Sequence, residues 1–282
     1  MCGPPPAGAP GMAELFARRP FSVRDQRGFT TIAMLCFVML YGPMITLVIY
    51  SFNDGNSVAV WEGFSWRWYE AAINNRQIQR ATVRSLQVAA FATIVSTTVA
   101  TMAALATTRT RPFRGQGLVY GLINQPLMVP EIVTAVALLM FFAIIKGATG
   151  YTGMGYLLAA HAAFCIPFAY MPIRARLEDM SLTLEQAAAD LYATPWRTFR
   201  YVTLPLLLPG IMAGAMLAFV ISLDDVVITL FVAGPGQDTL PLYVIGQLRR
   251  IVTPEMNAVS SLFLLASALL VTLFFFLSRR KK

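Results

Sequence analysis

Six long apolar stretches dominate the pattern of hydrophobic and polar positions along the chain. Each is close to or longer than the roughly 20 apolar residues that a helix needs to cross the hydrocarbon core of a membrane. The expected spans cover residues 29–52, 82–108, 118–146, 153–173, 206–233 and 256–278. These runs are continuous and lack the alternation of outer-membrane strands. The pattern therefore predicts an all-α integral membrane protein with six transmembrane helices.

Composition agrees with this prediction. Of the 282 residues, 57% are hydrophobic and 13% are charged, whereas about 25% carry charge in a soluble domain. The three cysteines, Cys2, Cys36 and Cys165, show no paired spacing, so we predict neither a disulfide framework nor a metal site. Residues 1–28 lack the basic segment and apolar core of a signal peptide, and we interpret them as a tail.

The net charge of +8 carries a topological signal. With a cytoplasmic N-terminus, 15 of the 22 Lys and Arg residues fall on the cytoplasmic side, including the basic tail 279–282, and seven fall outside. Cytoplasmic loops carry an excess of basic residues, and six spans return the chain to its starting side. Both termini are therefore predicted to be cytoplasmic. Insertion explains most of the positive charge, so membrane lipid is the expected neighbour and nucleic acid is not a predicted partner.

The longest predicted cytoplasmic loop, residues 174–205, has helical periodicity. An apolar face is formed by residues three or four positions apart: Leu184, Ala187, Ala188 and Leu191. Polar residues fill the rest of the turns: Glu185, Gln186 and Asp190. Pro195 is expected to end this helix and to begin a second one with Thr194 as its N-cap. Leu204 and Pro205 are then expected to break the chain before the fifth span. The pattern fits either insertion into a groove of another protein or packing against the chain's own spans.

The sequence "EQAAADLYATPWRTFRYVTLP" at residues 185–205 resembles the EAA motif of ABC importer permeases. Gln186, Ala187 and Ala188 align with Glu-Ala-Ala, although the family usually has glutamate at the first position. Tyr192 takes the place of the family's glycine. The resemblance implies that these helices lie in a cleft of an ATPase subunit and couple its closure to the membrane helices. The implied coupling residues are Glu185, Gln186, Ala187, Ala188, Asp190, Leu191, Tyr192, Pro195, Leu204 and Pro205.

The similarity extends over nearly the whole chain from about residue 30. Segments such as "YGPMITLVIYSFN" and "SLDDVVITLFVAGPGQDTLPLYV" are similar to the shorter, six-span permeases of putrescine/spermidine ABC importers. The resemblance implies an ABC importer type I permease fold in the bacterial inner membrane. The implied partners are a second, different permease subunit, two ATPase subunits and a periplasmic polyamine-binding protein. ATP and Mg²⁺ would be bound by the ATPase, because this chain has no G-x-x-x-x-G-K-[ST] loop and is not expected to be an enzyme.

Two alternatives stay open at the level of sequence. Related permeases import other small organic cations, amino-acid derivatives or iron chelates. A secondary transporter would instead use carboxylates within its spans as ion sites, but it would leave the two cytoplasmic helices unexplained.

Three carboxylates lie within the predicted spans: Glu131, Asp224 and Asp225. Such a residue costs about 2.5–3.5 kcal/mol in hydrocarbon and normally faces a cavity or a partner. At about 1.5 Å per residue, Glu131 would lie roughly 20 Å into a continuous third span. They either supply counter-charges for ammonium groups or pair with arginine and cap broken helices.

Neighbouring positions constrain these interpretations. Adjacent helical residues point about 100° apart, so one of Asp224 and Asp225 is expected to be structural unless the helix is broken there. His161 has no second ligand nearby and is expected to be a packing or interhelical hydrogen-bonding residue.

Overall fold

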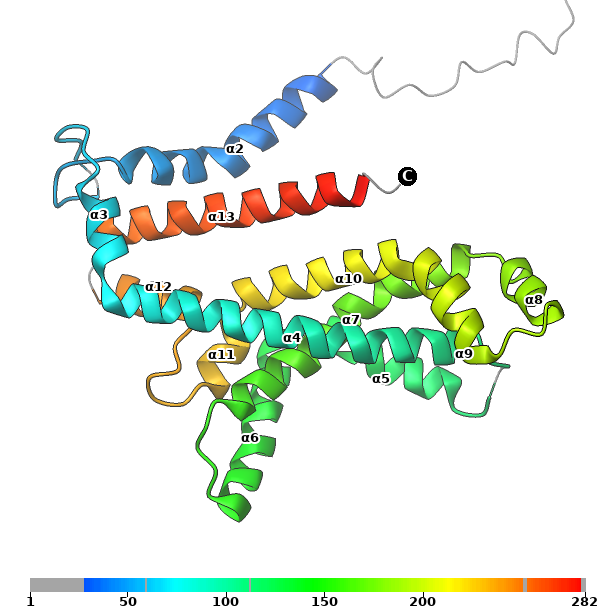
Figure 1. Cartoon of the computed structure of the whole chain (residues 1–282). Helices are drawn as coiled ribbons and strands as arrows, with labels where there is room; N and C mark the ends of the chain where they lie inside the picture. The colour runs from blue at the N-terminus through cyan, green and yellow to red at the C-terminus, as the bar shows by residue number, and fades with distance from the viewer. Residues whose placement is uncertain (1–27, 59, 112, 251–252, 280–282) are drawn as a thin grey trace, which may run out of the picture. The chain divides into compact units, whose positions relative to one another are not determined.

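The computed structural model describes residues 28–58, 60–111, 113–250 and 253–279 (Figure 1). The predicted N-terminal tail, apart from Gly28, and the basic tail beyond Arg279 lie outside the described residues. Within the described part, six helices are long and apolar enough to cross a membrane, which confirms the predicted number of spans. The chain divides into two compact units, residues 1–49 and 50–282.

Helix α2 (Phe29–Tyr50) makes up almost all of the described part of the first unit. Its side chains are exposed or half-buried, and they are apolar around nearly the whole helix circumference. A helix that is apolar on all sides is typical of a membrane span. Pro43 lies inside it, and the Thr46 hydroxyl donates a hydrogen bond of 2.9 Å to the Gly42 carbonyl in the same turn.

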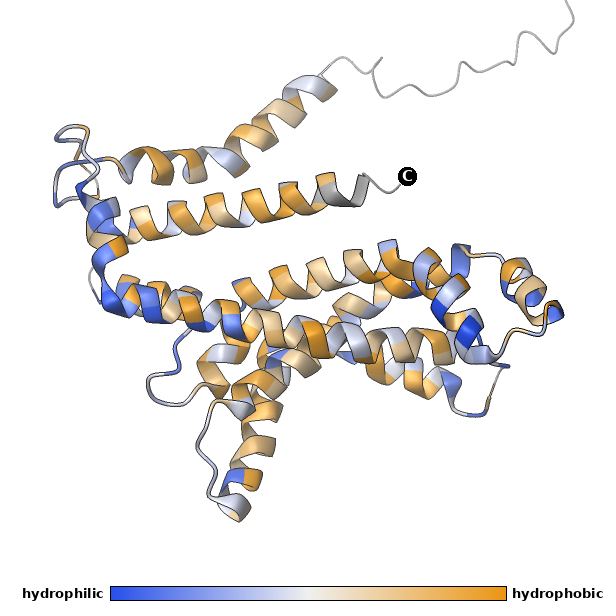
Figure 2. Ribbon diagram, viewed as in Figure 1, coloured by the Kyte–Doolittle hydropathy of each residue, from blue (hydrophilic) through white to orange (hydrophobic). Residues whose placement is uncertain are grey.

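The second unit is helical throughout its described elements. In chain order these are α3 (Arg67–Asn74), α4 (Arg76–Thr108), α5 (Gln116–Met128), α6 (Glu131–Thr149), α7 (Gly155–Asp179), α8 (Thr183–Asp190), α9 (Pro195–Thr198), the π-helical turn η2 (Phe199–Thr203), α10 (Leu204–Asp224), α11 (Val227–Val232), α12 (Leu240–Leu248) and α13 (Pro254–Arg279). Polar residues gather at α3 and the start of α4, and again at α8 and α9, which lie near opposite ends of α4 (Figure 2).

The core of this unit is formed by α4, α7 and α10, each of which packs against the other two. Its centre is built largely from alanines, including Ala100 of α4, Ala169 of α7 and Ala218 of α10, all fully buried. Gly214 of α10 lies so close to α7 that an added Cβ would stand 2.6 Å from the Ala169 carbonyl oxygen. Small residues allow this close approach, and van der Waals packing then holds membrane helices together where no hydrophobic driving force exists.

Two of the predicted spans are interrupted, which corrects the sequence-based boundaries. The run 118–146 is divided at Val129 and Pro130, where the residue before proline adopts an extended conformation (φ −92°, ψ 137°). The run 206–233 is divided at Asp225 (φ −62°, ψ 133°), between α10 and α11. Hydropathy could not locate either break, because apolar residues continue on both sides of it.

The predicted break at Leu204–Pro205 is wrong. The chain stays helical from Pro195 to Asp224 through α9, η2 and α10. In η2 the Leu204 N–H donates to the Phe199 carbonyl, five residues earlier, so the turn is wider than an α-turn. Pro205 is the second residue of α10 and follows this wider turn directly. The fifth membrane helix therefore continues directly into the segment that resembles the EAA motif.

Candidate functional site

The three predicted carboxylates meet at the two helix breaks. Glu131 is the first residue of α6, Asp224 is the last of α10, and Asp225 lies in the gap before α11. Helices α6 and α11 pack against each other, and all three carboxylates line one cavity of about 330 Å³. The prediction of Glu131 in the middle of a continuous helix is wrong, because Pro130 ends α5 and starts a new helix there.

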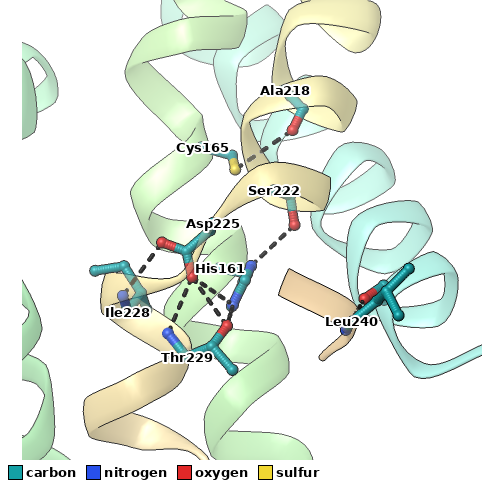
Figure 3. A network of polar contacts seen from close by, with 9 residues as sticks. His161, Cys165, Ala218, Ser222, Asp225, Ile228, Thr229 and Leu240 are labelled. Carbon is teal, nitrogen blue, oxygen red and sulfur yellow. Dashed lines mark hydrogen bonds and ion pairs between the residues drawn. The ribbon is translucent and has the colours of Figure 1, made fainter. Parts of the chain in front are cut away.

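Asp225 caps the start of α11. Its carboxylate accepts hydrogen bonds from the main-chain N–H groups of Ile228 (3.2 Å) and Thr229 (2.9 Å) and from the Thr229 hydroxyl (2.9 Å) (Figure 3). The first N–H groups of a helix have no partner within the helix, so a carboxylate at this position satisfies them and is itself stabilised. The Asp225 side chain is 1% exposed. Asp225 thus has the helix-capping role that the sequence left open.

His161 of α7 ties the two sides of this break together. Its Nδ1 lies 2.9 Å from the Ser222 hydroxyl of α10, and its Nε2 lies 3.0 Å from the Thr229 hydroxyl of α11 and 3.4 Å from Asp225 Oδ2 (Figure 3). Since the Thr229 hydroxyl donates to Asp225, it accepts from an Nε2–H, and Nδ1 is left to accept from Ser222. A neutral imidazole protonated at Nε2 satisfies every bond. The predicted interhelical hydrogen-bonding role of His161 is confirmed.

Asp224 differs from its neighbour in exposure and in bonding. Asp224 is exposed, whereas Asp225 is buried. Within the described residues, the Asp224 carboxylate makes no hydrogen bond and no ion pair. Glu131, half-buried in the first turn of α6, lies close enough to Asp225 for the two carboxyl groups to interact. Negative charge is favourable at a helix N-terminus. The cavity therefore presents one uncommitted carboxylate, Asp224, beside two that helix ends stabilise.

The walls of this cavity are otherwise apolar. They include Phe164 and Phe168 of α7 and Val220 and Ile221 of α10. Non-helical backbone within a membrane is tolerated only where protein buries it or where it lines a polar cavity. Two helix breaks and three carboxylates around one cavity fit a place where a polar solute passes.

The segment that resembles the EAA motif forms two short helices, α8 and α9. Thr194 caps α9 by accepting a hydrogen bond from the Arg197 N–H, and Pro195 is the first residue of α9, as predicted. The side chains of α8 are exposed or half-buried, Gln186, Ala187 and Asp190 among the exposed ones. Leu184 is 52% exposed and Leu191 is 82% exposed. An apolar face in this state of exposure is available to another protein rather than to the chain's own spans.

Tyr192 adopts the left-handed backbone conformation that glycine normally supplies, with φ of +58°. The Tyr192 N–H donates to the Ala189 carbonyl (2.9 Å), and the Ala193 N–H donates to the Ala188 carbonyl (3.0 Å). This pair of bonds is the Schellman motif that ends many helices. The tyrosine side chain is 95% exposed. The turn after α8 therefore has the Schellman geometry that a glycine usually completes, but the residue in the left-handed conformation is a tyrosine, for which that conformation is strained.

Glu185 connects α8 to two membrane helices. Its Oε1 lies 3.2 Å from Arg109 Nε, just after α4, and accepts a 2.9 Å hydrogen bond from the Thr203 hydroxyl in η2. Arg109 Nη2 also donates to the Met180 carbonyl (3.2 Å). These partners could not be predicted from the sequence, in which Arg109 is one of several basic residues of a predicted cytoplasmic loop. Displacing α8 would therefore pull directly on α4 and on the helix that leads to Asp224.

Comparison with known proteins gives a consistent assignment. Residues 96–280 match the family described as "Binding-protein-dependent transport system inner membrane component". The putrescine transport system permease protein PotI of Escherichia coli is 40% identical over 236 residues, which cover 83% of this chain and 84% of the relative. The spermidine/putrescine transport system permease protein PotC of Haemophilus influenzae is 38% identical over 244 residues, covering 86% and 93%.

Solved structures show the same fold. A chain of a bacterial ABC transporter involved in the import of the acidic polysaccharide alginate matches with a TM-score of 0.71 at 16% identity, covering 91% of this chain and 97% of that one. A chain of the MetNI methionine ABC transporter, in inward-facing conformations, matches with a TM-score of 0.59 at 19% identity, covering 71% and 94%. The ABC importer permease fold is thereby established.

Proposed function

The chain belongs to the family of binding-protein-dependent transport system inner membrane components, and on this premise we propose that it forms part of the path by which polyamines enter the cell. As a member of that family it is an inner membrane permease subunit and not an enzyme, and the ATPase is a separate subunit. The curated relatives named above carry putrescine or spermidine in their names. Putrescine and spermidine are accordingly the first cargoes to test.

The observation that carries this proposal is the uncommitted carboxylate of Asp224 beside Glu131 and Asp225 in a cavity with apolar walls. A polyamine alternates ammonium groups with methylene segments. Carboxylates would neutralise the ammonium groups, and Phe164 and Phe168 would contact the methylenes and offer cation–π attraction. Because Asp225 is committed to α11, Asp224 and Glu131 are the residues proposed to meet the cargo.

The proposed assembly follows from the family. Importers of this kind work with an ATPase and a substrate-binding protein. We infer a second, different permease subunit that supplies the other half of the path, two ATPase subunits that bind ATP and Mg²⁺, and a periplasmic polyamine-binding protein. The distribution of Lys and Arg supports cytoplasmic termini and a cytoplasmic position for α8 and α9.

Coupling to the ATPase is assigned to α8, α9 and the turn between them. Exposed Leu184, Leu191 and Tyr192 would enter a cleft of the ATPase, and the bonds of Glu185 would pass the movement to Arg109 and Thr203. Since α9, η2 and α10 form one continuous helical path, this movement would reach the helix break at Asp225. ATP hydrolysis by the separate ATPase subunits would thereby change the surroundings of the carboxylate cavity.

The test is uptake of radiolabelled putrescine and spermidine into proteoliposomes that hold the complete importer. The assay is run with and without ATP inside and binding protein outside. Uptake that requires both ATP and binding protein is the expected result. ATP hydrolysis without entry of either polyamine would refute the proposed cargo and favour another organic cation, an amino-acid derivative or an iron chelate. Uptake by this chain alone would refute the ATP-driven mechanism.

A further inference from the structure

A second cavity, of about 580 Å³, lies near the end of α4 that is distant from α8 and α9. Its walls come from the first turns of α4, from the end of α11 and the residues that follow it, and from α12 and Arg250 just beyond it. Charge sets it apart from the carboxylate cavity, because its charged lining residues are Arg80, Arg84, Arg250 and a single acidic residue, Asp238. We refer to it as the arginine cavity.

The guanidinium groups of this cavity are largely uncommitted. Arg84 Nη1 donates a 3.2 Å hydrogen bond to the main-chain carbonyl of Asp238. Within the described part of the chain, the guanidinium groups of Arg80 and Arg250 make no ion pair and no hydrogen bond. Each guanidinium has five donors in a planar fork that matches a carboxylate or phosphate. The cavity is therefore equipped to bind an anionic group.

The spacing of the arginines along α4 is electrostatically unfavourable unless an anionic group is bound. Arg76, Arg80 and Arg84 follow one another at intervals of four residues, so their side chains share one face of α4 and repel each other. Arg76, the first residue of the helix, also lies where the helix dipole disfavours positive charge. Neither insertion nor helix stability explains them, since topology calls for basic residues on the opposite side of the membrane.

The arginine cavity lies at the N-terminal end of α4, a helix that is longer than the hydrocarbon core is thick. With 33 residues, α4 is about 50 Å long, whereas the core is about 30 Å thick. Arg84 precedes Thr108 by about 36 Å along the helix axis. Polar side chains of Gln77, Tyr243 and Gln247 complete the lining. A soluble partner can therefore reach this cavity from the side of the membrane opposite to α8 and α9.

We propose that the arginine cavity docks carboxylates on the surface of the polyamine-loaded binding protein; this inference rests on the proposed function. A protein that holds a polycation must surround it with carboxylates, so its face around the ligand is acidic. Arg80, Arg84 and Arg250 complement that charge and repel free polyamine.

The two cavities are connected through α11. Val226 and Val227, at its start, line the carboxylate cavity, and Leu230 and Ala233, toward and just beyond its end, line the arginine cavity. From Val227 to Ala233 the helix rises by about 9 Å. A binding protein held by the arginines would thus release its cargo close to Asp224. The opposite charges of the two cavities would then act in sequence, first on the partner and then on the polyamine.

The experiment measures ATP hydrolysis by the complete importer in nanodiscs as polyamine-loaded binding protein is titrated. We compare the wild type with Arg80→Gln/Arg84→Gln and with the same variant carrying Arg250→Gln. Arg76→Gln is the matched control, because it removes a charge from the same helix outside the cavity. The concentration of binding protein for half-maximal stimulation is expected to rise at least tenfold in the triple variant, with the maximal rate retained, and to change less than twofold in the control.

Measurements at varied ionic strength and a lysine variant distinguish the effect of lost charge from the effect of lost folding. The half-maximal concentration of the wild type should rise with ionic strength, and the triple variant should lose most of that dependence. Arg80→Lys/Arg84→Lys keeps the charge and should stay within about threefold of the wild type. If the glutamine variants fail to assemble, the wild type still tests the proposal, because a half-maximal concentration that does not rise with ionic strength would refute docking through charge.

Three results would overturn the inference. The first is an unchanged half-maximal concentration in the triple variant. The second is an effect that appears only in nanodiscs containing anionic lipid and not in phosphatidylcholine, which would assign the arginines to a lipid phosphate. The third is a wild-type importer that polyamine-loaded binding protein does not stimulate, which would also refute the proposed cargo. In the first two cases the proposed function stands.

Discussion

Asp224 and Asp225 are adjacent in the chain but have different environments because the helix ends between them. Asp225 accepts the free N–H groups of α11, whereas Asp224 stays exposed at the cavity. The sequence predicts that one of the pair is structural, since a continuous helix would point them about 100° apart. It could not predict which one, because that depends on the residue at which α10 ends.

Substitution of the two aspartates should therefore affect different properties, transport for Asp224 and stability for Asp225. Asp224→Asn should lower the kcat/KM of polyamine uptake about 10–100-fold, since a hydrogen bond to a charged group contributes about 1.5–3 kcal/mol, and should leave the thermal unfolding midpoint unchanged. Asp225→Ala should destabilise the chain by about 2–4 kcal/mol, because it removes a helix cap and leaves His161 and Thr229 with an unmet partner. Uptake assays and thermal unfolding in detergent measure the two effects, with exposed Asp54→Asn as the control.

If Asp224→Asn transports normally in a fully assembled importer, Asp224 does not contact the cargo. If Asp225→Ala is as stable as the wild type, the network drawn in Figure 3 contributes little to holding the break.

Tyr192 carries backbone strain that its neighbours do not. A non-glycine residue in the left-handed region costs about 1–2 kcal/mol, and asparagine tolerates this region better than tyrosine does. Because the side chain is 95% exposed, replacing it removes little packing. Tyr192→Asn should therefore slow hydrogen exchange in residues 183–195 about threefold to fivefold, and Tyr192→Val should speed it up. Equal exchange in all three chains would show that the turn is relaxed.

At the scale of elements, the sequence predicts helices more reliably than it predicts their interruptions. The two-helix form of the EAA-like segment follows from the periodicity of Leu184 to Leu191 and from the capping residue Thr194, and the structure has both helices. The continuation through Pro205 could not be predicted, because it depends on the wide turn of η2. The contact of Glu185 with Arg109 joins residues 76 positions apart and leaves no local signal.

The exposed apolar face of α8 carries the next prediction. Leu184→Ala/Leu191→Ala should reduce the amount of polyamine imported per ATP hydrolysed at least tenfold, because burying a leucine at an interface contributes about 1.5–3 kcal/mol. The chain itself should keep its stability, since both side chains are largely exposed in it. Parallel measurement of uptake and of phosphate release checks the ratio. Leu122→Ala, at another exposed leucine, is the control, and an unchanged ratio in the double variant would remove α8 from the coupling path.

At the scale of the whole molecule, hydropathy predicts the number of spans and close relatives establish the family, but neither predicts the cavities. Both cavities depend on how helices far apart in the sequence meet. The carboxylate cavity brings Glu131 together with Asp224, and the arginine cavity brings Arg80 together with Arg250. Their opposite charges, at the two ends of α11, suit a path that receives an acidic protein first and a polycation second.

This order of events requires the arginine cavity and the EAA-like segment to face opposite sides of the membrane. The count of basic residues predicts that Leu191 is cytoplasmic and that Asn56 is outside. Single cysteines at these two exposed positions, in a chain whose Cys2, Cys36 and Cys165 are replaced, can be tested with a membrane-impermeant maleimide. In spheroplasts, the maleimide should react with the cysteine at position 56 at once. It should react with the cysteine at position 191 only after the membrane has been permeabilised. A cysteine at buried Ala104 should stay unlabelled in both conditions. The reverse pattern at 56 and 191 would invert the topology, and the arginine cavity would then face the cytoplasm, where no periplasmic binding protein could reach it.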